Sequence, residues 1–237
     1  MPPDHGRRYD LVALDVAGTT VEEHGAVYEA LADAVRAAGA RPSQADLRRW
    51  MGADKLEAVQ GLLSGGGGSP DASVVQDTYG DFRRRLASAY AQHPPEPLPG
   101  VPEALRELRD AGVQVVLTTG FSRDVTDDLL QTVGWAATGD AGRRVPTVDA
   151  VVCAEDVGAG RPAPYMVFEG MRRTGVHDVR RVLVAGDTVL DLRAGSNAGA
   201  GAVVGVLTGA MDAAALGRER HTHLLASVAQ LPTLVLV

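Results

Sequence analysis

Several apolar segments of the sequence end in, or are soon followed by, side chains that can bind metal ions or phosphate. These are Asp15 after residues 10–16, Thr119 (or its neighbour Thr118) in residues 113–120, Arg161 in the loop after residues 149–156, and Asp187 with Asp191 after residues 181–187. Carboxylates from two strand ends can hold a hard divalent cation such as Mg²⁺. A hydroxyl and a guanidinium opposite them suit the oxygens of a phosphate group. Because one aspartate at a strand end is common, the predicted metal and anion site depends on the whole set.

Lys55 is the second candidate, because it is the one lysine among 23 basic residues. The chain also lacks isoleucine, and this composition indicates a coding bias that replaces lysine by arginine wherever a positive charge suffices. Unlike a guanidinium, an amine can lose its proton near neutral pH and act as a nucleophile. Lys55 is therefore either a reactive amine or a surface lysine that survived by chance.

The segments around these residues predict a fold. Near-continuous apolar runs alternate with helical patterns after residue 99, and such alternation is typical of a parallel sheet covered on both faces. The predicted strands are residues 10–16, 113–120, 149–156, 181–187 and 202–208. In doubly wound sheets, ligands bind beyond the carboxyl ends of the strands. The fold class is thus α/β, a doubly wound parallel sheet that brings the polar strand ends to one edge.

A second unit interrupts this pattern after the first strand. Helical periodicity covers residues 24–39, 43–50, 54–63 and 72–91, with no strand pattern between them. We therefore predict two domains: a Rossmann-like core of residues 1–21 and 99–237, and an all-helical insert of residues 22–98.

These motifs resemble those of the haloacid dehalogenase superfamily. Its members begin with an aspartate nucleophile in DxDGT, and this chain has Asp15 in DVAGT. A serine or threonine, a basic residue and an acidic pair follow; here they are Thr119, Arg161 in GRPAPYM, and Asp187 with Asp191 in GDTVLD. The helical insert matches the small cap domain of that superfamily, so residues 22–98 are expected to form a helical cap.

Two departures from the superfamily pattern are similar to the phosphonatase family. The second aspartate of DxDGT, which protonates a leaving ester oxygen, is Ala17 here, and the usual motif-three lysine is Arg161. Phosphonatases also carry a cap lysine in an MGxxK stretch, and this chain reads Met51-Gly52-Ala53-Asp54-Lys55. The resemblance implies that Lys55 forms a Schiff base with the substrate carbonyl.

The resemblance also implies roles for the remaining residues. Asp15, Lys55, Thr119 and Arg161 are expected to be catalytic, and Asp15 accepts the phosphoryl group. Substrate contacts are expected from Gly18, Thr19, Gly120 and Met51. Mg²⁺ is the expected cofactor, and the expected metal-site residues are Asp15, Ala17 through its backbone carbonyl, Asp187 and Asp191. Within this set, Asp191 is expected to orient a metal-bound water or Arg161 rather than to bind the ion directly.

Around the expected aldehyde position, the sequence departs from the phosphonatase pattern. The usual histidine three residues after the lysine is Ala58, the tyrosine after TTG is Phe121, and a cysteine after the first motif is Gly25, with His24 beside it as a partial substitute. The expected function is Mg²⁺-dependent cleavage of the C–P bond of phosphonoacetaldehyde or a closely related 2-oxoalkylphosphonate, through the Lys55 Schiff base and a phosphoaspartate. The alternatives are a phosphomonoesterase or phosphomutase of the same superfamily, or a binding protein with an inactive site.

The composition excludes several other classes. The net charge is −7, with a pI near 5.3, which argues against a general affinity for nucleic acid or anionic membranes. One cysteine rules out a disulfide framework, and no apolar run approaches the length of a membrane span. We expect a cytoplasmic enzyme with a small phosphonate substrate, and a homodimer through the cap as the possible assembly.

Overall fold

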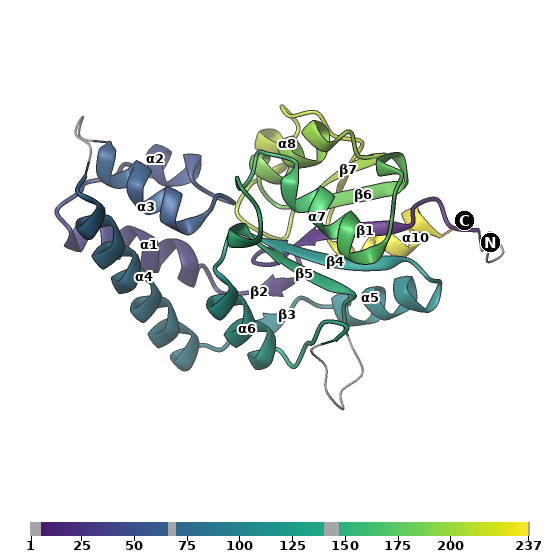
Figure 1. Cartoon of the computed structure of the whole chain (residues 1–237), viewed down its shortest axis with the longest axis horizontal. Coiled ribbons are helices and arrows are strands. Elements are labelled where there is room, and N and C mark those ends of the chain that lie inside the picture. Colours follow the sequence, from purple (N-terminus) through teal and green to yellow (C-terminus); the bar gives the residue numbers. More distant parts are fainter. Residues whose placement is uncertain (1–5, 66–69, 140–146, 237) are drawn as a thin grey trace.

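The core of the protein is a six-stranded, fully parallel sheet (Figure 1). The computed structural model describes residues 6–65, 70–139 and 147–236. The strands lie in the order β5-β4-β1-β6-β7-β8, so the first strand of the chain is central. Their bounds are β1 Leu11–Asp15, β4 Gln114–Thr119, β5 Ala150–Cys153, β6 Val182–Gly186, β7 Ala202–Val206 and β8 His223–Leu225. Asp15 pairs in register with Thr118, so the ends of β1 and β4 meet at one edge.

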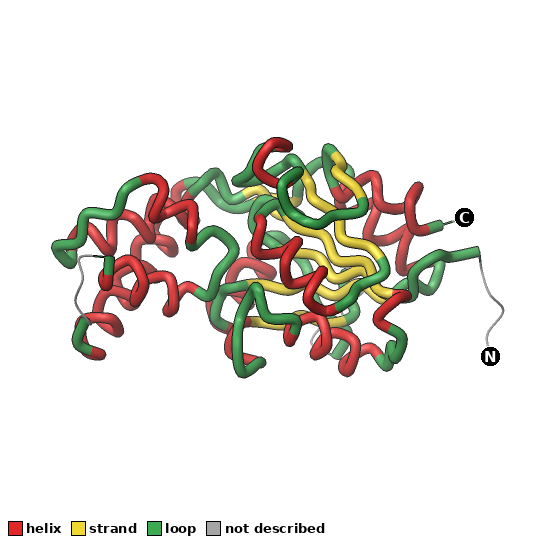
Figure 2. The backbone as a smooth tube through the Cα atoms, turned by 90° about the horizontal axis from the view of Figure 1, so that it is seen from above, coloured by secondary structure: helices red, strands yellow, loops and turns green. Residues whose placement is uncertain are grey.

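Helices cover both faces of this sheet (Figure 2). Alternate residues of β1 point to opposite faces: Leu11 packs with α7 and α8, whereas Leu14 belongs to the core under α5, α6 and α10. The bounds of these helices are α5 Val101–Asp110, α6 Arg123–Thr132, α7 Tyr165–Thr174, α8 Val189–Ala198 and α10 Leu231–Val235; the short α9 spans Ala213–Leu216. Burial on both faces explains why the strands are apolar throughout.

Four helices form a separate group beside the carboxyl ends of the strands (Figure 1). We call this group the helical unit: α1 Ala26–Ala37, α2 Gln44–Arg49, α3 Lys55–Ser64 and α4 Ala72–Gln92. Local signals set its helix starts, because Ser43 forms a capping box with Asp46, and Asp54 accepts from the amide of Glu57. α4 packs against α1 and α3. Two short strands, β2 Val21–Glu22 and β3 Glu96–Pro97, pair where the chain enters and leaves the unit.

The predicted fold class is confirmed, and the five predicted strands lie within the predicted ranges. The sequence analysis missed the β2–β3 ribbon, the short helix α9, the edge strand β8 and the final helix α10. The ribbon also corrects the expectation that residues 22–98 contain only helices, since two-residue strands carry no periodic signal. Within the described ranges, no helix combines the length and the apolar character needed to cross a bilayer.

Candidate active site

A small cavity lies between the carboxyl edge of the sheet and the helical unit. Its volume is about 20 Å³, which is space for roughly one water molecule. The core contributes Asp15, Ala17, Thr119, Gly120, Phe121, Arg161, Asp187 and Thr188, and the helical unit contributes Val27, Tyr28, Gly52 and Lys55. The cavity therefore brings together the main catalytic residues predicted from widely separated parts of the sequence.

Arg161 connects the polar strand ends. Its Nη1 donates to Asp15 Oδ1 at 2.7 Å, its Nε lies 3.0 Å from Asp191 Oδ1, and its Nη2 donates to the hydroxyl and carbonyl oxygens of Thr118 at 2.8 and 2.9 Å. The guanidinium is only 3% exposed. Both charges of each ion pair are thus removed from water, and this arrangement is stable only because every donor has an acceptor.

Three carboxylates, those of Asp15, Asp187 and Asp191, place one oxygen each within 4.8 Å of the others. Burial, opposed by Arg161 and assisted by Asp191, raises the pKa of Asp15 to about 6. Burial followed by repulsion from Asp15 and Asp191 raises the pKa of Asp187 to about 8. One guanidinium does not neutralise three buried carboxylates, so the cluster could hold a divalent cation, whose charge would reverse these shifts.

The three carboxylates differ in their partners: Asp15 and Asp191 pair with the Arg161 guanidinium, whereas Asp187 accepts from neutral donors. Asp191 is fully engaged: Oδ1 faces Arg161, and Oδ2 accepts from the amide and hydroxyl of Thr188 at 3.0 and 2.5 Å. This favours orientation of Arg161 as its role, rather than direct metal ligation. Asp187 accepts from the Thr19 hydroxyl at 3.0 Å and the Ala210 amide at 2.7 Å, which fixes its position beside Asp15.

Lys55 is the first residue of α3, and it enters the cavity from the helical unit. It is 4% exposed, and its Nζ donates to the carbonyl oxygen of Ala53 at 2.7 Å. Its Nζ lies 5.5 Å from the centre of the Phe121 ring. Burial lowers the pKa of Lys55 to about 8, with Arg161 contributing and Asp15 opposing. This environment therefore increases the fraction of neutral, nucleophilic amine.

Thr119, rather than Thr118, lines the cavity. The Thr118 hydroxyl instead accepts from Arg161. Gly120 also lines the cavity, as the resemblance implied. Of the described residues that form its wall, none is Gly18, Thr19 or Met51, the other three expected substrate contacts. The Thr19 hydroxyl donates to Asp187 instead. Gly52, the neighbour of Met51, lines the cavity in place of Met51.

Glycines allow the helical unit to approach the core closely. Gly52 has φ +81°, and a Cβ on it would lie 2.3 Å from the Thr188 hydroxyl oxygen. The carbonyl of Gly52 accepts from Arg161 at 3.3 Å, and the amide of Lys55 donates to the carbonyl of Gly120 at 3.2 Å. Because these contacts leave a cavity of only about 20 Å³, a substrate larger than water fits only if the site widens.

The sequence analysis missed Tyr28, in the first turn of α1, as a cavity residue. In the sequence, the pattern around Tyr28 does not distinguish it from an aromatic residue of the hydrophobic core. The signal that could have indicated a place near the site is that α1 directly follows the Asp15 motif. The suggested substitute His24 is exposed and lies 4.0 Å from Glu22, so it does not reach the cavity. Ala58 is fully buried, and Phe121 places an apolar ring beside Lys55.

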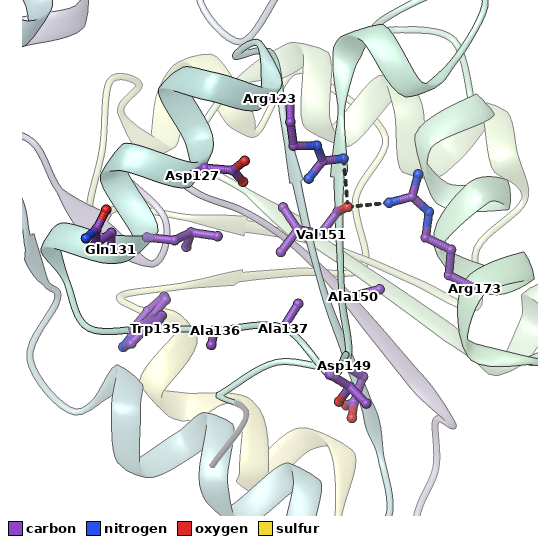
Figure 3. Close-up of a pocket in the computed structure, with 12 residues that line it drawn as sticks. Arg123, Asp127, Gln131, Trp135, Ala136, Ala137, Asp149, Ala150, Val151 and Arg173 are labelled. Atoms are coloured by element: carbon purple, nitrogen blue, oxygen red, sulfur yellow. Dashed lines mark hydrogen bonds between the residues drawn. The ribbon is translucent and has the colours of Figure 1, made fainter. Parts of the chain in front are cut away.

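A larger hollow of about 820 Å³ lies along the edge strand β5 (Figure 3). Arg123 and Arg173 converge there on the carbonyl oxygen of Val151, at 3.4 and 2.6 Å, and both also pair with Asp156. The two guanidinium groups are thus already engaged, and the motif residues do not line this hollow. The predicted catalytic residues therefore lie at the smaller cavity.

Known proteins of similar sequence include enzymes named phosphonoacetaldehyde hydrolase. The chain is 29% identical over 217 residues to the phosphonoacetaldehyde hydrolase of Bacillus cytotoxicus, covering 86% of this chain and 78% of that protein. The enzyme of the same name from Bacillus cereus is 28% identical with the same coverage.

Solved structures share the fold. A phosphonoacetaldehyde hydrolase-like protein from Oleispira antarctica has a TM-score of 0.79 at 22% identity, covering 97% of this chain and 92% of that one. A predicted phosphoglycolate phosphatase from Haemophilus somnus has a TM-score of 0.70 at 17% identity, covering 96% and 98%. The family model for haloacid dehalogenase-like hydrolases matches residues 9–199. The chain belongs to the haloacid dehalogenase-like hydrolase family.

Proposed function

We propose that the protein is a Mg²⁺-dependent hydrolase that cleaves the C–P bond of phosphonoacetaldehyde or a closely related 2-oxoalkylphosphonate. The observation that carries this proposal is the position of the chain's one lysine: Lys55 is buried, has a lowered pKa, and faces the same cavity as Asp15. The relatives named phosphonoacetaldehyde hydrolase support the same substrate class.

The chemistry of a C–P bond explains the combination of Lys55 with Ala17. Cleavage of a phosphate ester leaves an alkoxide, which a carboxylic acid at position 17 would protonate. Cleavage of a C–P bond leaves an electron pair on carbon, and a general acid positioned for oxygen has nothing to protonate. An amine that condenses with the adjacent carbonyl forms an iminium, which accepts this electron pair as an enamine.

The core side of the cavity is suited to the phosphoryl group. Asp15 is the nucleophile, so the phosphorus–carbon bond breaks as the phosphorus–oxygen bond to its carboxylate forms. Arg161 and Thr119 orient phosphoryl oxygens opposite this carboxylate. Water then hydrolyses the phosphoaspartate, which releases phosphate and restores Asp15. The enamine takes up a proton on carbon, and a second water hydrolyses the resulting iminium, which releases the carbonyl product and restores Lys55.

Residues around Asp15 fit a magnesium ion. Asp15, Asp187 and the backbone carbonyl of Ala17 would hold it, because Mg²⁺ prefers carboxylate and carbonyl oxygens. When bound, Mg²⁺ screens the repulsion between the nucleophilic carboxylate and the phosphoryl oxygens. Asp191 keeps Arg161 in place through the 3.0 Å contact with its Nε.

Phosphate release from two substrates tests this proposal against a phosphomonoesterase or phosphomutase of the same fold. We expect phosphate from phosphonoacetaldehyde at a kcat/KM at least a hundredfold above that for p-nitrophenyl phosphate. The control is Lys55→Arg, which keeps the positive charge but cannot form an imine, and it should lose only the first activity. Preference for the ester, with Lys55→Arg still active, would contradict C–P cleavage.

A further inference from the structure

Tyr28 is positioned to contact the substrate of the proposed reaction. It lies in the first turn of α1, while Lys55 begins α3, and these neighbouring helices place both side chains in the wall of one cavity. Since the cavity holds only about 20 Å³, the groups that line it are close to one another. A substrate bound between the core and the helical unit would therefore meet Tyr28 as well as Lys55.

The hydroxyl of Tyr28 has no hydrogen-bond partner among the described residues, whereas other polar side chains of the cavity do. Lys55 donates to Ala53, Asp15 accepts from Arg161, and Asp187 accepts from Thr19. Burial first, and then the charges of Asp187 and Asp15, raise the pKa of Tyr28 well above its usual value. The phenol thus stays protonated. Tyr28 is partly exposed, so its hydroxyl is available to a ligand that supplies an acceptor.

The position of the reacting groups indicates which substrate atom accepts this hydrogen bond. The phosphoryl oxygens face Asp15, Arg161 and Thr119 on the core side, so the carbonyl must lie on the side of Lys55. Of the other residues that the helical unit contributes to the cavity wall, Val27 and Gly52 have no polar side-chain atom. Tyr28 is the remaining side-chain donor that the helical unit supplies to the described wall of the cavity.

Resting on the proposed function, we infer that the Tyr28 hydroxyl donates a hydrogen bond to the carbonyl oxygen of the 2-oxoalkylphosphonate. This bond orients the carbonyl carbon toward Lys55 and stabilises the oxygen as it gains negative charge. Tyr28 keeps its own proton throughout. The overall step converts Lys–NH₃⁺ and C=O into Lys–NH⁺=C and H₂O. Both hydrogens of the released water come from the lysine nitrogen. One of these protons leaves the amine before it attacks the carbonyl and is returned to the oxygen afterwards.

Tyr28→Phe removes only the hydroxyl and therefore tests this role. We expect borohydride trapping of Lys55 with phosphonoacetaldehyde, and phosphate release, both to slow about 10- to 100-fold. The matched control is Tyr90→Phe, since the Tyr90 hydroxyl likewise has no partner but is buried and does not line the cavity. Its rates should stay within twofold of wild type. Tyr28→His, which restores a donor, should recover part of the lost rate, and thermal melting of each variant reports on folding.

The outcomes separate this inference from the proposed function. If wild type is not trapped, the Schiff-base function itself fails. If wild type is trapped and Tyr28→Phe is trapped equally fast, the role of Tyr28 is overturned while the proposed function stands. Slower phosphate release from Tyr28→Phe with unchanged trapping would place Tyr28 in the phosphoryl-transfer step and would also overturn the inference.

Discussion

Replacing Lys55 by methionine should stabilise the protein at neutral pH while abolishing C–P cleavage. The Lys55 amine is 4% exposed, and its one hydrogen-bond acceptor in the described structure is the Ala53 carbonyl, at 2.7 Å. Burial lowers its pKa from 10.5 to about 8. Because the unfolded chain binds this proton more tightly than the folded protein does, ionised Lys55 destabilises the fold at neutral pH.

The size of the effect follows from this difference in pKa. A pKa of about 8 in place of 10.5 corresponds to roughly 3 kcal/mol at pH 7. Methionine has a similar length and no charge, and loss of the hydrogen bond to Ala53 offsets about 1 kcal/mol. We therefore expect the free energy of unfolding to rise by about 2 kcal/mol, or roughly 4–8 °C in Tm for a chain of this length.

The pH dependence makes this prediction specific. As pH rises from 8 toward 10.5, wild type gains stability, because its folded form has already lost the proton that the unfolded chain still binds. The advantage of Lys55→Met should thus shrink by about 2 kcal/mol between pH 7 and pH 9.5. Urea unfolding of both proteins at the two pH values measures it, and Lys55→Arg, which keeps a buried charge, should gain nothing. Two results would refute the claim that burial lowers the pKa of Lys55. One is a Lys55→Met variant that is no more stable than wild type at pH 7, and the other is a stability advantage that is the same at both pH values.

Three further predictions concern the core side of the cavity. Asp15→Asn should reduce phosphate release at least 10⁴-fold without lowering Tm, since the amide cannot accept a phosphoryl group; a rate within tenfold of wild type would exclude Asp15 as the nucleophile. Exhaustive chelation should abolish turnover, and added Mg²⁺ should restore it; full activity after chelation would argue for metal-free chemistry. Calorimetry should show that Asp187→Ala binds Mg²⁺ at least tenfold more weakly than wild type. Gly52→Ala should lower kcat/KM at least tenfold, because its Cβ would lie 2.3 Å from the Thr188 hydroxyl oxygen at a positive φ; unchanged kinetics would show that this close contact is not needed for catalysis.

Local patterns made much of the fold predictable. The strands of the sheet are buried on both faces and therefore appear as continuous apolar runs, and side chains such as Ser43 and Asp54 cap helices of the helical unit. The missed elements are short and depend on distant partners: β8 pairs only with β7, and α10 packs on α5. No periodic pattern reveals such contacts.

The candidate site was predictable in its motifs but not in its walls. Asp15, Arg161 and Asp187 could be placed together because parallel strands end at one edge of the sheet. Tyr28 and Gly52 enter the cavity only through the docking of the helical unit, which depends on close contacts such as that between Gly52 and Thr188. Likewise, the choice between Thr118 and Thr119 required the position of Arg161, which occupies the Thr118 hydroxyl.

Reduction with borohydride in the presence of phosphonoacetaldehyde, followed by mass spectrometry, tests the central claim most directly. Since Lys55 is the one lysine in the chain, only the N-terminal amine needs a control peptide. We predict a reduced imine on the peptide containing Lys55 in wild type, dependent on substrate, and no adduct with Lys55→Arg, which should also release no phosphate from this substrate. An unmodified Lys55 in wild type, together with continued phosphate release by Lys55→Arg, would contradict the Schiff-base mechanism.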